Sequence, residues 1–190
     1  MIECVWRFLS MNLNLTEVIL EDGRSIDTEL PLELEELSYG FGTYPIEEKE
    51  PMKLEVVRTK KKVLKIHGKS SLTVRIPCDR CLEEVSVRIP LDFEELAFAG
   101  SPEEEETDSD LESAFEKDYF IDGYNLDVDK LAYGEALLNW PSRVLCSEDC
   151  KGLCPVCGQN LNRSECGCDR TQLDPRMAKV LDIFSNFKEV

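Results

Sequence analysis

The clearest pattern in the chain is an alternation of apolar and polar residues at every second position between Met52 and Phe98. A period of two is typical of β-strands that bury one face. Turns are expected at Lys60–Lys62, Gly68–Ser70 and Cys78–Cys81, between the apolar runs. The region therefore predicts an antiparallel meander, with its first cysteine pair at the end of a strand. The alternating apolar positions are Leu54, Val56, Leu64, Ile66, Leu72, Val74, Ile76, Val85, Val87, Ile89, Leu91 and Phe93.

The first fifty residues give a weaker pattern. Leu13–Leu20 reads as a strand followed by an Asp22-Gly23 turn. Residues 25–50 are polar and acidic, and their pattern predicts no defined element. Residues 1–10 are expected to be a dispensable extension, because their apolar run is broken by Arg7 and lacks the small-residue cleavage site of a signal peptide.

Helical spacing appears only towards the C-terminus. A helix is predicted from about Val128 to Trp140, where Leu131, Glu135 and Leu138 form a stripe along one side. A last helix is predicted to begin at Asp174-Pro175, with the aspartate as N-cap and the proline in the first turn. The C-terminal part is thus expected to be mainly helical around a cysteine-rich segment.

Nine carboxylates against one lysine separate these regions at residues 101–118, which are too like-charged to pack and predict a solvated linker. We expect a β-rich domain at 1–100, this acidic linker, and a part at 119–190 that holds a helix, a zinc-knuckle segment and a C-terminal helix. The predicted fold class is α+β. Its sheet is expected to be antiparallel or a partial barrel.

The net charge narrows the range of partners. The chain has 39 acidic and 22 basic residues, a formal net charge of −17. Such a surface repels phosphate backbones and favours a basic protein partner. No apolar run reaches the length of a membrane span, and no export signal is recognisable, so a cytoplasmic location without membrane contact is expected.

The cysteines carry the most specific chemical signal. Eight of the nine lie in close pairs, and only Cys4 stands apart. An odd number of thiols without an export signal favours metal binding over disulfides. Within the tail, Cys154, Cys157, Cys166 and Cys168 can close one tetrahedral zinc site over a short segment.

A second zinc site is predicted from Cys78, Cys81, Cys146 and Cys150, which would join the sheet to the loop after the first C-terminal helix. Two zinc ions are expected, and one at minimum. Two alternatives remain open for these residues. Cys78 and Cys81 could simply end a hairpin while Cys146 or Cys150 ligates the tail site, or Cys78 could share a site with Cys166 or Cys168.

Nothing in the sequence predicts catalysis. Four-sulfur zinc sites are closed, whereas catalytic zinc keeps an open position. The one histidine, His67, lies in a lysine-rich hairpin far from the cysteines in sequence. Phosphate loops, nucleophile elbows and metalloprotease helix motifs are absent. We therefore expect a protein that is not an enzyme and has no small-molecule substrate.

One basic group lies around the first hairpin of the meander. Its main interpretation is an exposed turn that protects the sheet from edge pairing. The second interpretation is a local contact with RNA phosphates on an otherwise acidic molecule. Its members are Arg58, Lys60, Lys61, Lys62, Lys65 and Lys69.

Two motifs carry a resemblance to a known family. The chain has Cys-Asp-Arg-Cys-Leu at 78–82 and the long motif from Cys146 through Cys154-Pro-Val-Cys-Gly to Asn162, followed by Asp174-Pro175-Arg176. Over roughly residues 50–185 it resembles the bacterial YceD family, described as large ribosomal RNA subunit accumulation protein. The extension at 1–10 and the acidic linker depart from the family pattern without touching these motifs.

The resemblance implies a role in accumulation of large-subunit ribosomal RNA and in ribosome assembly, with no known enzymatic activity. It suggests a basic ribosomal protein of the large subunit, or its precursor particle, as partner, with ribosomal RNA as a further contact. Two hypotheses follow: a non-enzymatic zinc-binding assembly factor, and an RNA-processing enzyme with structural zinc. A change in the length of precursor ribosomal RNA would separate them.

Overall fold

The computed structural model describes residues 11–21, 24–40, 42–60, 63–98 and 120–169. The chain forms two compact units, one of Met1–Ile76 with Ser86–Ser142, the other of Pro77–Val85 with Arg143–Val190. This division differs from the expected domain boundaries, because the first C-terminal helix groups with the sheet. The extension at 1–10, the acidic stretch at 101–118 and the helix expected after Asp174 lie outside the described residues.

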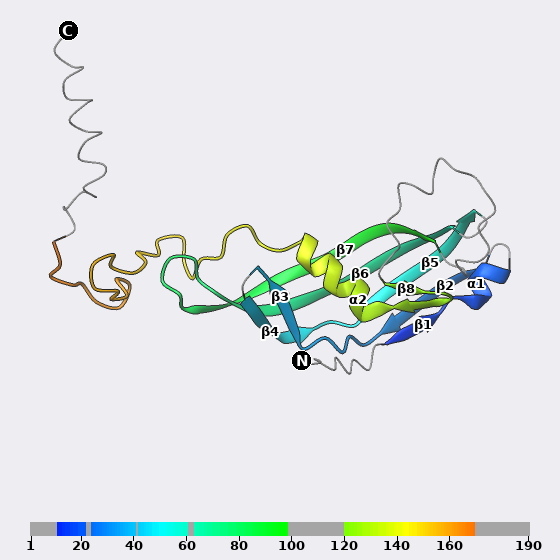
Figure 1. The fold of residues 1–190 in the computed structure, drawn as a ribbon, viewed down its shortest axis with the longest axis horizontal. Helices are drawn as coiled ribbons and strands as arrows, with labels where there is room; N and C mark the ends of the chain where they lie inside the picture. Colours follow the sequence, from blue (N-terminus) through cyan, green and yellow to red (C-terminus); the bar gives the residue numbers. More distant parts are fainter. Residues whose placement is uncertain (1–10, 22–23, 41, 61–62, 99–119, 170–190) are drawn as a thin grey trace, which may run out of the picture. The chain divides into compact units, whose positions relative to one another are not determined.

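The larger of two sheets in the first unit has six strands (Figure 1). The long strand β6 pairs with β5 along its first half, with β4 along its second half, and with β7 on its other side. Strand β2 extends the sheet beyond β5, and β3 extends it beyond β4. The strands are β2 (Ser25–Leu30), β3 (Glu36–Tyr39), β4 (Gly42–Lys49), β5 (Met52–Lys60), β6 (Val63–Pro77) and β7 (Glu84–Phe98).

The alternating pattern from Met52 onward is confirmed as strands with one buried face. Leu54, Val56, Leu64 and Ile66 are at most 1% exposed, and their neighbours in sequence are not buried. Their apolar side chains therefore form the core, as the period of two predicts. Residues 25–50, for which no element was predicted, supply β2, β3 and β4.

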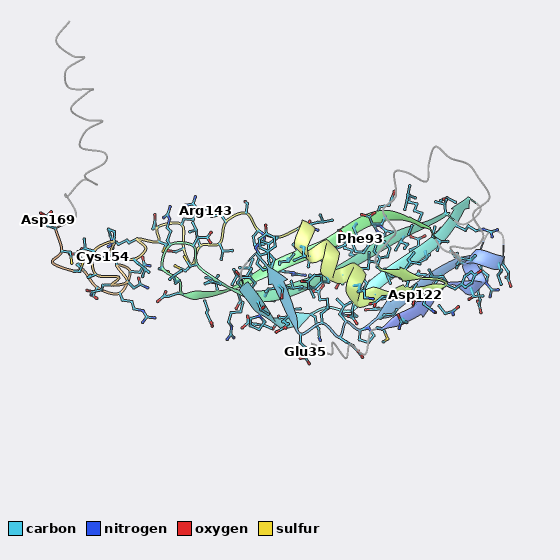
Figure 2. The ribbon with its side chains drawn as sticks, viewed as in Figure 1. Glu35, Phe93, Asp122, Arg143, Cys154 and Asp169 are labelled. Atoms are coloured by element: carbon cyan, nitrogen blue, oxygen red, sulfur yellow. The ribbon has the colours of Figure 1, made fainter. Side chains whose placement is uncertain are left out.

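The turn predicted at Gly68–Ser70 is wrong, because β6 runs straight through it. Gly68 serves packing here. A Cβ at this position would lie 2.2 Å from Cζ of Phe93, a residue of β7 that Figure 2 labels. The glycine thus leaves room for a buried aromatic ring, which is a common reason for glycine inside a strand.

The strand predicted at Leu13–Leu20 is also wrong. The segment forms the short strand β1 (Asn12–Asn14) and then the helix α1 (Thr16–Leu20). Oδ1 of Asn14 accepts a hydrogen bond from the backbone N–H of Thr16 at 3.0 Å and turns the chain. Leu15 and Val18 are fully buried at a spacing of three, which fits a helical turn better than a strand.

The predicted helix is confirmed as α2 (Val128–Leu138), which follows the hairpin of β8 (Ile121–Asp122) and β9 (Asn125–Asp127). Asp127 caps it by accepting from the backbone N–H of Lys130 at 3.0 Å. The buried side includes Leu131 and Glu135, but Leu138 is 77% exposed, so its place in the predicted stripe is corrected. Leu138 is the last helical residue, and the covered surface ends before it.

A buried carboxylate joins α2 to two other segments. Asp129 is 3% exposed and accepts hydrogen bonds from the backbone N–H groups of Met11 and Glu33 at 3.2 and 2.8 Å. In the middle of the helix, Tyr133 donates its hydroxyl to the carbonyl of Ser38 in β3 at 3.1 Å. These contacts hold α2 against the sheet unit.

The described residues are mostly antiparallel β-structure with the two helices α1 and α2, which agrees with an α+β class. Neither helix is both long and apolar enough to cross a lipid bilayer. The described part of the second unit has little regular structure. Its only isolated bridge pairs Leu153 with Asn160, so its fold depends on turns and side-chain contacts.

Candidate metal centres

The first cysteine cluster consists of Cys78 and Cys81, from the turn between β6 and β7, with Cys146 and Cys150. Their four Sγ atoms lie within 4.8 Å of one another. The Sγ atoms of Cys78 and Cys150 are 3.8 Å apart, and those of Cys81 and Cys146 are 3.5 Å apart. These separations exceed the ~2 Å of a disulfide bond.

Backbone hydrogen bonds set the turn that carries the first pair. The N–H of Cys78 donates to the carbonyl of Glu83 at 2.8 Å, and the N–H of Leu82 donates to the carbonyl of Cys78 at 2.9 Å. Leu82 adopts a positive φ of 61°, which few side-chain-bearing residues do. The turn therefore brings the Sγ atoms of Cys78 and Cys81 within 4.8 Å of each other.

Two polar residues inside the motif bind the turn to the second pair, and sequence reasoning missed their role. Asp79 accepts from the backbone N–H of Val144 at 2.8 Å, and its own N–H donates to the carbonyl of Val144 at 2.9 Å. Arg80 donates to the carbonyl of Cys150 at 2.8 Å. The available signal was two polar residues placed at the tip of a Cys-x-x-Cys turn.

The second cysteine cluster consists of Cys154, Cys157, Cys166 and Cys168, whose Sγ atoms also lie within 4.8 Å of one another. Cys154 is labelled in Figure 2. Its N–H donates to the carbonyl of Gln159 at 2.8 Å, and its carbonyl accepts from Gly158 at 2.8 Å. Gly158 has a φ of 74°, the left-handed conformation for which glycine is suited.

Hydrogen bonds to sulfur already favour thiolate in the first cluster. Burial raises the pKa of Cys78, but the backbone N–H groups of Arg80 and Cys81 outweigh it and lower this pKa to about 6. The opposite holds for Cys81. The N–H of Glu83 lowers its pKa, but burial and the neighbouring sulfurs raise it to about 12. A nearby cation would favour the thiolate form of Cys81 and so offset this rise in its pKa.

The second cluster shows the same division. The backbone N–H groups of Cys157 and Val156 lower the pKa of Cys154 to about 6. Hydrogen bonding with the sulfur of Cys157, and then burial, raise the pKa of Cys168 to about 12. Each cluster thus combines thiols of lowered pKa with thiols of raised pKa, and a bound divalent cation would favour the thiolate form of all four.

The donor set and spacing fit zinc. Tetrahedral Zn²⁺ with Zn–S bonds of about 2.3 Å places its sulfurs about 3.8 Å apart, close to the separations in the first cluster. Cys78, Cys81 and Cys150 are at most 3% exposed, and Cys154 is 2% exposed. Each cluster could hold a metal ion through four sulfurs.

The two groups of four are the ones that the sequence spacing favoured. The alternatives that exchange Cys78, Cys146 or Cys150 between the groups are not the arrangement in the structure. Cys78 and Cys81 belong to the same compact unit as their partners, so the first cluster lies wholly within that unit. Ligation of an ion by these residues stays a prediction.

Three of the six cations around the first hairpin contact other parts of the protein. Arg58 donates to the backbone carbonyl of Ile19, Lys65 pairs with Glu94 at 2.8 Å, and Lys69 pairs with Asp92 at 3.4 Å. The side chains of Lys60, Lys61 and Lys62 are not among those that the structure describes. An RNA contact by this group stays a prediction. His67 is half-buried in β6, paired in register with Glu55.

Comparison with known proteins shows which family the chain matches. A family model described as "Large ribosomal RNA subunit accumulation protein YceD" matches residues 66–184, more than half of the chain. Uncharacterized proteins of Mycobacterium bovis and Mycobacterium tuberculosis are 35% identical over 107 residues, 56% of this chain and 48% of theirs.

An Arabidopsis thaliana protein named "Large ribosomal RNA subunit accumulation protein YCED homolog 1, chloroplastic" is 28% identical over 143 residues, 64% of this chain and 44% of its own. The chain thus spans about half the length of the curated relatives it matches. No solved structure matches.

Proposed function

Since this chain belongs to the YceD family, whose name points to large-subunit ribosomal RNA accumulation, we propose that it is a non-enzymatic, zinc-binding factor supporting that accumulation and ribosome assembly. The observation that carries the proposal is the pair of four-sulfur clusters. A zinc ion held by four protein sulfurs has no open position for a substrate, so its contribution is structural.

The residues of the second unit define what zinc would stabilise. In the described part of this unit, Cys78, Cys81 and Cys150 themselves form a buried cluster, and the partly buried residues around them are Val85, Leu145 and Leu153. The apolar burial among these described residues is small compared with the conformational entropy of ordering the segment. A structural ion at each cluster, when bound, supplies the missing folding free energy. A folded second unit would then present its surface to a partner.

The partner that the charge favours is a basic ribosomal protein of the large subunit, or a precursor particle that carries it. A net charge of −17 steers a strongly basic partner towards the chain and repels bare RNA. The acidic stretch at 102–112 is the proposed first contact. Deleting it should slow association with such a protein, most clearly at low salt, without changing the zinc content.

The decisive experiment removes the gene and measures the ratio of large-subunit to small-subunit ribosomal RNA. The wild-type chain should restore a lowered ratio, and a chain with Cys78→Ser and Cys154→Ser should not. An unchanged ratio in the deletion strain would contradict the proposal. An exposed change, Ser147→Ala, serves as the matched control between two cluster cysteines.

A second measurement separates the proposal from RNA processing. The purified, zinc-loaded chain is incubated with precursor ribosomal RNA, and the RNA lengths are compared before and after. A binding factor leaves them unchanged. Shortened RNA whose appearance depends on this chain would make it an RNA-processing enzyme.

A further inference from the structure

Asn162 lies in the loop between two residues of the second cluster, Cys157 and Cys166, yet its side chain reaches the first cluster. Its Nδ2 group donates a hydrogen bond to Sγ of Cys150 at 3.2 Å. Cys150 is 3% exposed, so this contact is made in a largely dry site. One side chain thus extends from the loop of one four-sulfur group to a sulfur of the other.

The orientation of the amide follows from its second contact. The backbone N–H of Lys151 donates to Oδ1 of Asn162 at 2.7 Å. Because a backbone N–H can only donate, the oxygen must face Lys151 and the NH₂ group must face the sulfur. The side chain therefore acts as a donor to Cys150, as a thiolate requires.

The backbone of the loop is held against the segment that carries Cys150. The N–H of Leu161 donates to the carbonyl of Gly152 at 2.9 Å, and within the loop itself the N–H of Asn162 donates to Oδ1 of Asn160 at 2.9 Å. Gly152 has a φ of 75°, and a Cβ there would lie 3.0 Å from the carbonyl oxygen of Arg80. The two clusters are therefore connected by short contacts within one compact unit.

We propose that Asn162 is a positioning residue that couples metal binding at the two cysteine clusters. Four thiolates around a divalent ion leave a net charge of −2, which a hydrogen-bond donor to sulfur partly offsets. Filling the second cluster closes the loop at Cys157 and Cys166 and holds the Asn162 amide at Cys150. Each ion then strengthens binding of the other by the same factor.

This inference rests on the proposed metal binding, and its test separates the two. Zn²⁺ is titrated into the reduced full chain in competition with a chelator of known affinity. The overall association constant for binding two Zn²⁺ ions to the wild type is compared with a product of two association constants. Each of these is measured on a variant that keeps only one intact cluster. One carries Cys157→Ser and Cys166→Ser, and the other carries Cys78→Ser and Cys81→Ser. A ratio above one measures the coupling.

The variant is Asn162→Asp, which keeps the acceptor for Lys151 but replaces the donor to sulfur by a carboxylate oxygen. Loss of a hydrogen-bond partner of a metal ligand typically costs 10- to 100-fold in affinity. We expect the excess, which is the factor by which the overall association constant exceeds the product of the two single-cluster constants, to be about tenfold in the wild type. It should vanish in Asn162→Asp. Asn162→Ala, which adds no charge, should also abolish the excess.

Gln159→Glu is the matched control, because it makes the same amide-to-carboxylate change in the same loop. The side-chain amide of Gln159 donates to Oγ of Ser164 at 2.5 Å, and to no sulfur among the described cysteines. It should leave the excess unchanged. With Co²⁺ in the first cluster, the sulfur-to-metal charge-transfer band should shift in Asn162→Asp and not in Gln159→Glu.

Two failures are distinguishable. A reduced chain that binds no Zn²⁺ overturns the proposed metal binding and the coupling together. A chain that binds two ions with no excess, or with an excess that Asn162→Asp and Gln159→Glu change equally, overturns the coupling and leaves the metal sites standing.

Discussion

Glu135 is a buried carboxyl whose charged form is disfavoured. Its side of α2 faces the core, and the residue is 6% exposed. Burial, and then the charge of Glu95, raise its pKa above the usual 4.5. The folded state therefore holds this proton more tightly than the unfolded state, and the associated stability is lost as the pH rises through the raised pKa.

Glu135→Gln should consequently stabilise the sheet unit at neutral pH. A gain of about 1 kcal/mol corresponds to a rise in Tm of roughly 2–4 °C for a chain of this size. The gain should fade as the pH falls through 4.5, below which the carboxyl becomes protonated in the unfolded state as well. Thermal unfolding of the variant and of the exposed control Glu36→Gln, measured from pH 4 to pH 8, checks this; an equal gain at every pH would contradict it.

The thiols of the clusters predict how zinc binding depends on pH. Cys78 and Cys154, with pKa values of about 6, are already ionised at pH 7.5, whereas Cys81 and Cys168, at about 12, are not. Each ion should therefore displace fewer protons than the four thiols it binds. Affinity should fall with decreasing pH, and more steeply below about 6, where further thiols are protonated.

Calorimetric titration in buffers of different ionisation enthalpy gives the number of protons released per ion. Release of all four at pH 7.5 would show that no thiol is preionised in the metal-free chain. Loss of pH dependence altogether would show that the sulfurs are not the ligands.

At the scale of an element, β6 depends on Gly68. Because a Cβ there would meet the ring of Phe93 at 2.2 Å, Gly68→Ala should force the ring or the strand to shift. Overpacking of this kind typically costs about 1–3 kcal/mol. Urea unfolding of the sheet unit should show that loss, and Gly68→Ala combined with Phe93→Leu should recover part of it. If Gly68→Ala alone left the free energy of unfolding unchanged, the Phe93 ring would not require a glycine at this position.

At the scale of the whole molecule, the two units should differ in their dependence on metal. The core of the sheet unit is built from aliphatic residues such as Leu54 and Ile66, whereas four of the buried residues in the described part of the second unit are cysteines, beside Val144 and Leu161. Structural zinc contributes on the order of 10 kcal/mol to folding of small metal domains. Removal of metal by a chelator should therefore unfold the second unit and leave the first folded.

Amide hydrogen exchange with and without chelator measures this directly. Protection should be lost at Leu153, Cys154 and Leu161, whose amides are hydrogen-bonded in the second unit, and retained in β5 and β6. Loss in both units together would show that the sheet also depends on the metal.

Local sequence determined the elements whose physical cause is local. The period of two placed β5, β6 and β7, and the helical spacing placed α2. The spacing of the cysteine pairs indicated the two groups of four, because a Cys-x-x-Cys turn brings two sulfurs together whatever surrounds it.

Only the tertiary structure decided the features that depend on residues distant in sequence. Gly68 read as a turn because nothing local reveals the Phe93 ring above it, and Leu13–Leu20 read as a strand because the burial of Leu15 and Val18 depends on what packs against them. The burial of Asp129 likewise depends on the backbone N–H groups of Met11 and Glu33, which are distant in sequence and donate to its carboxylate. The contact of Asn162 with the first cluster also depends on the tertiary structure. Folding brings its Nδ2 atom within 3.2 Å of Sγ of Cys150, which lies twelve positions away in the sequence.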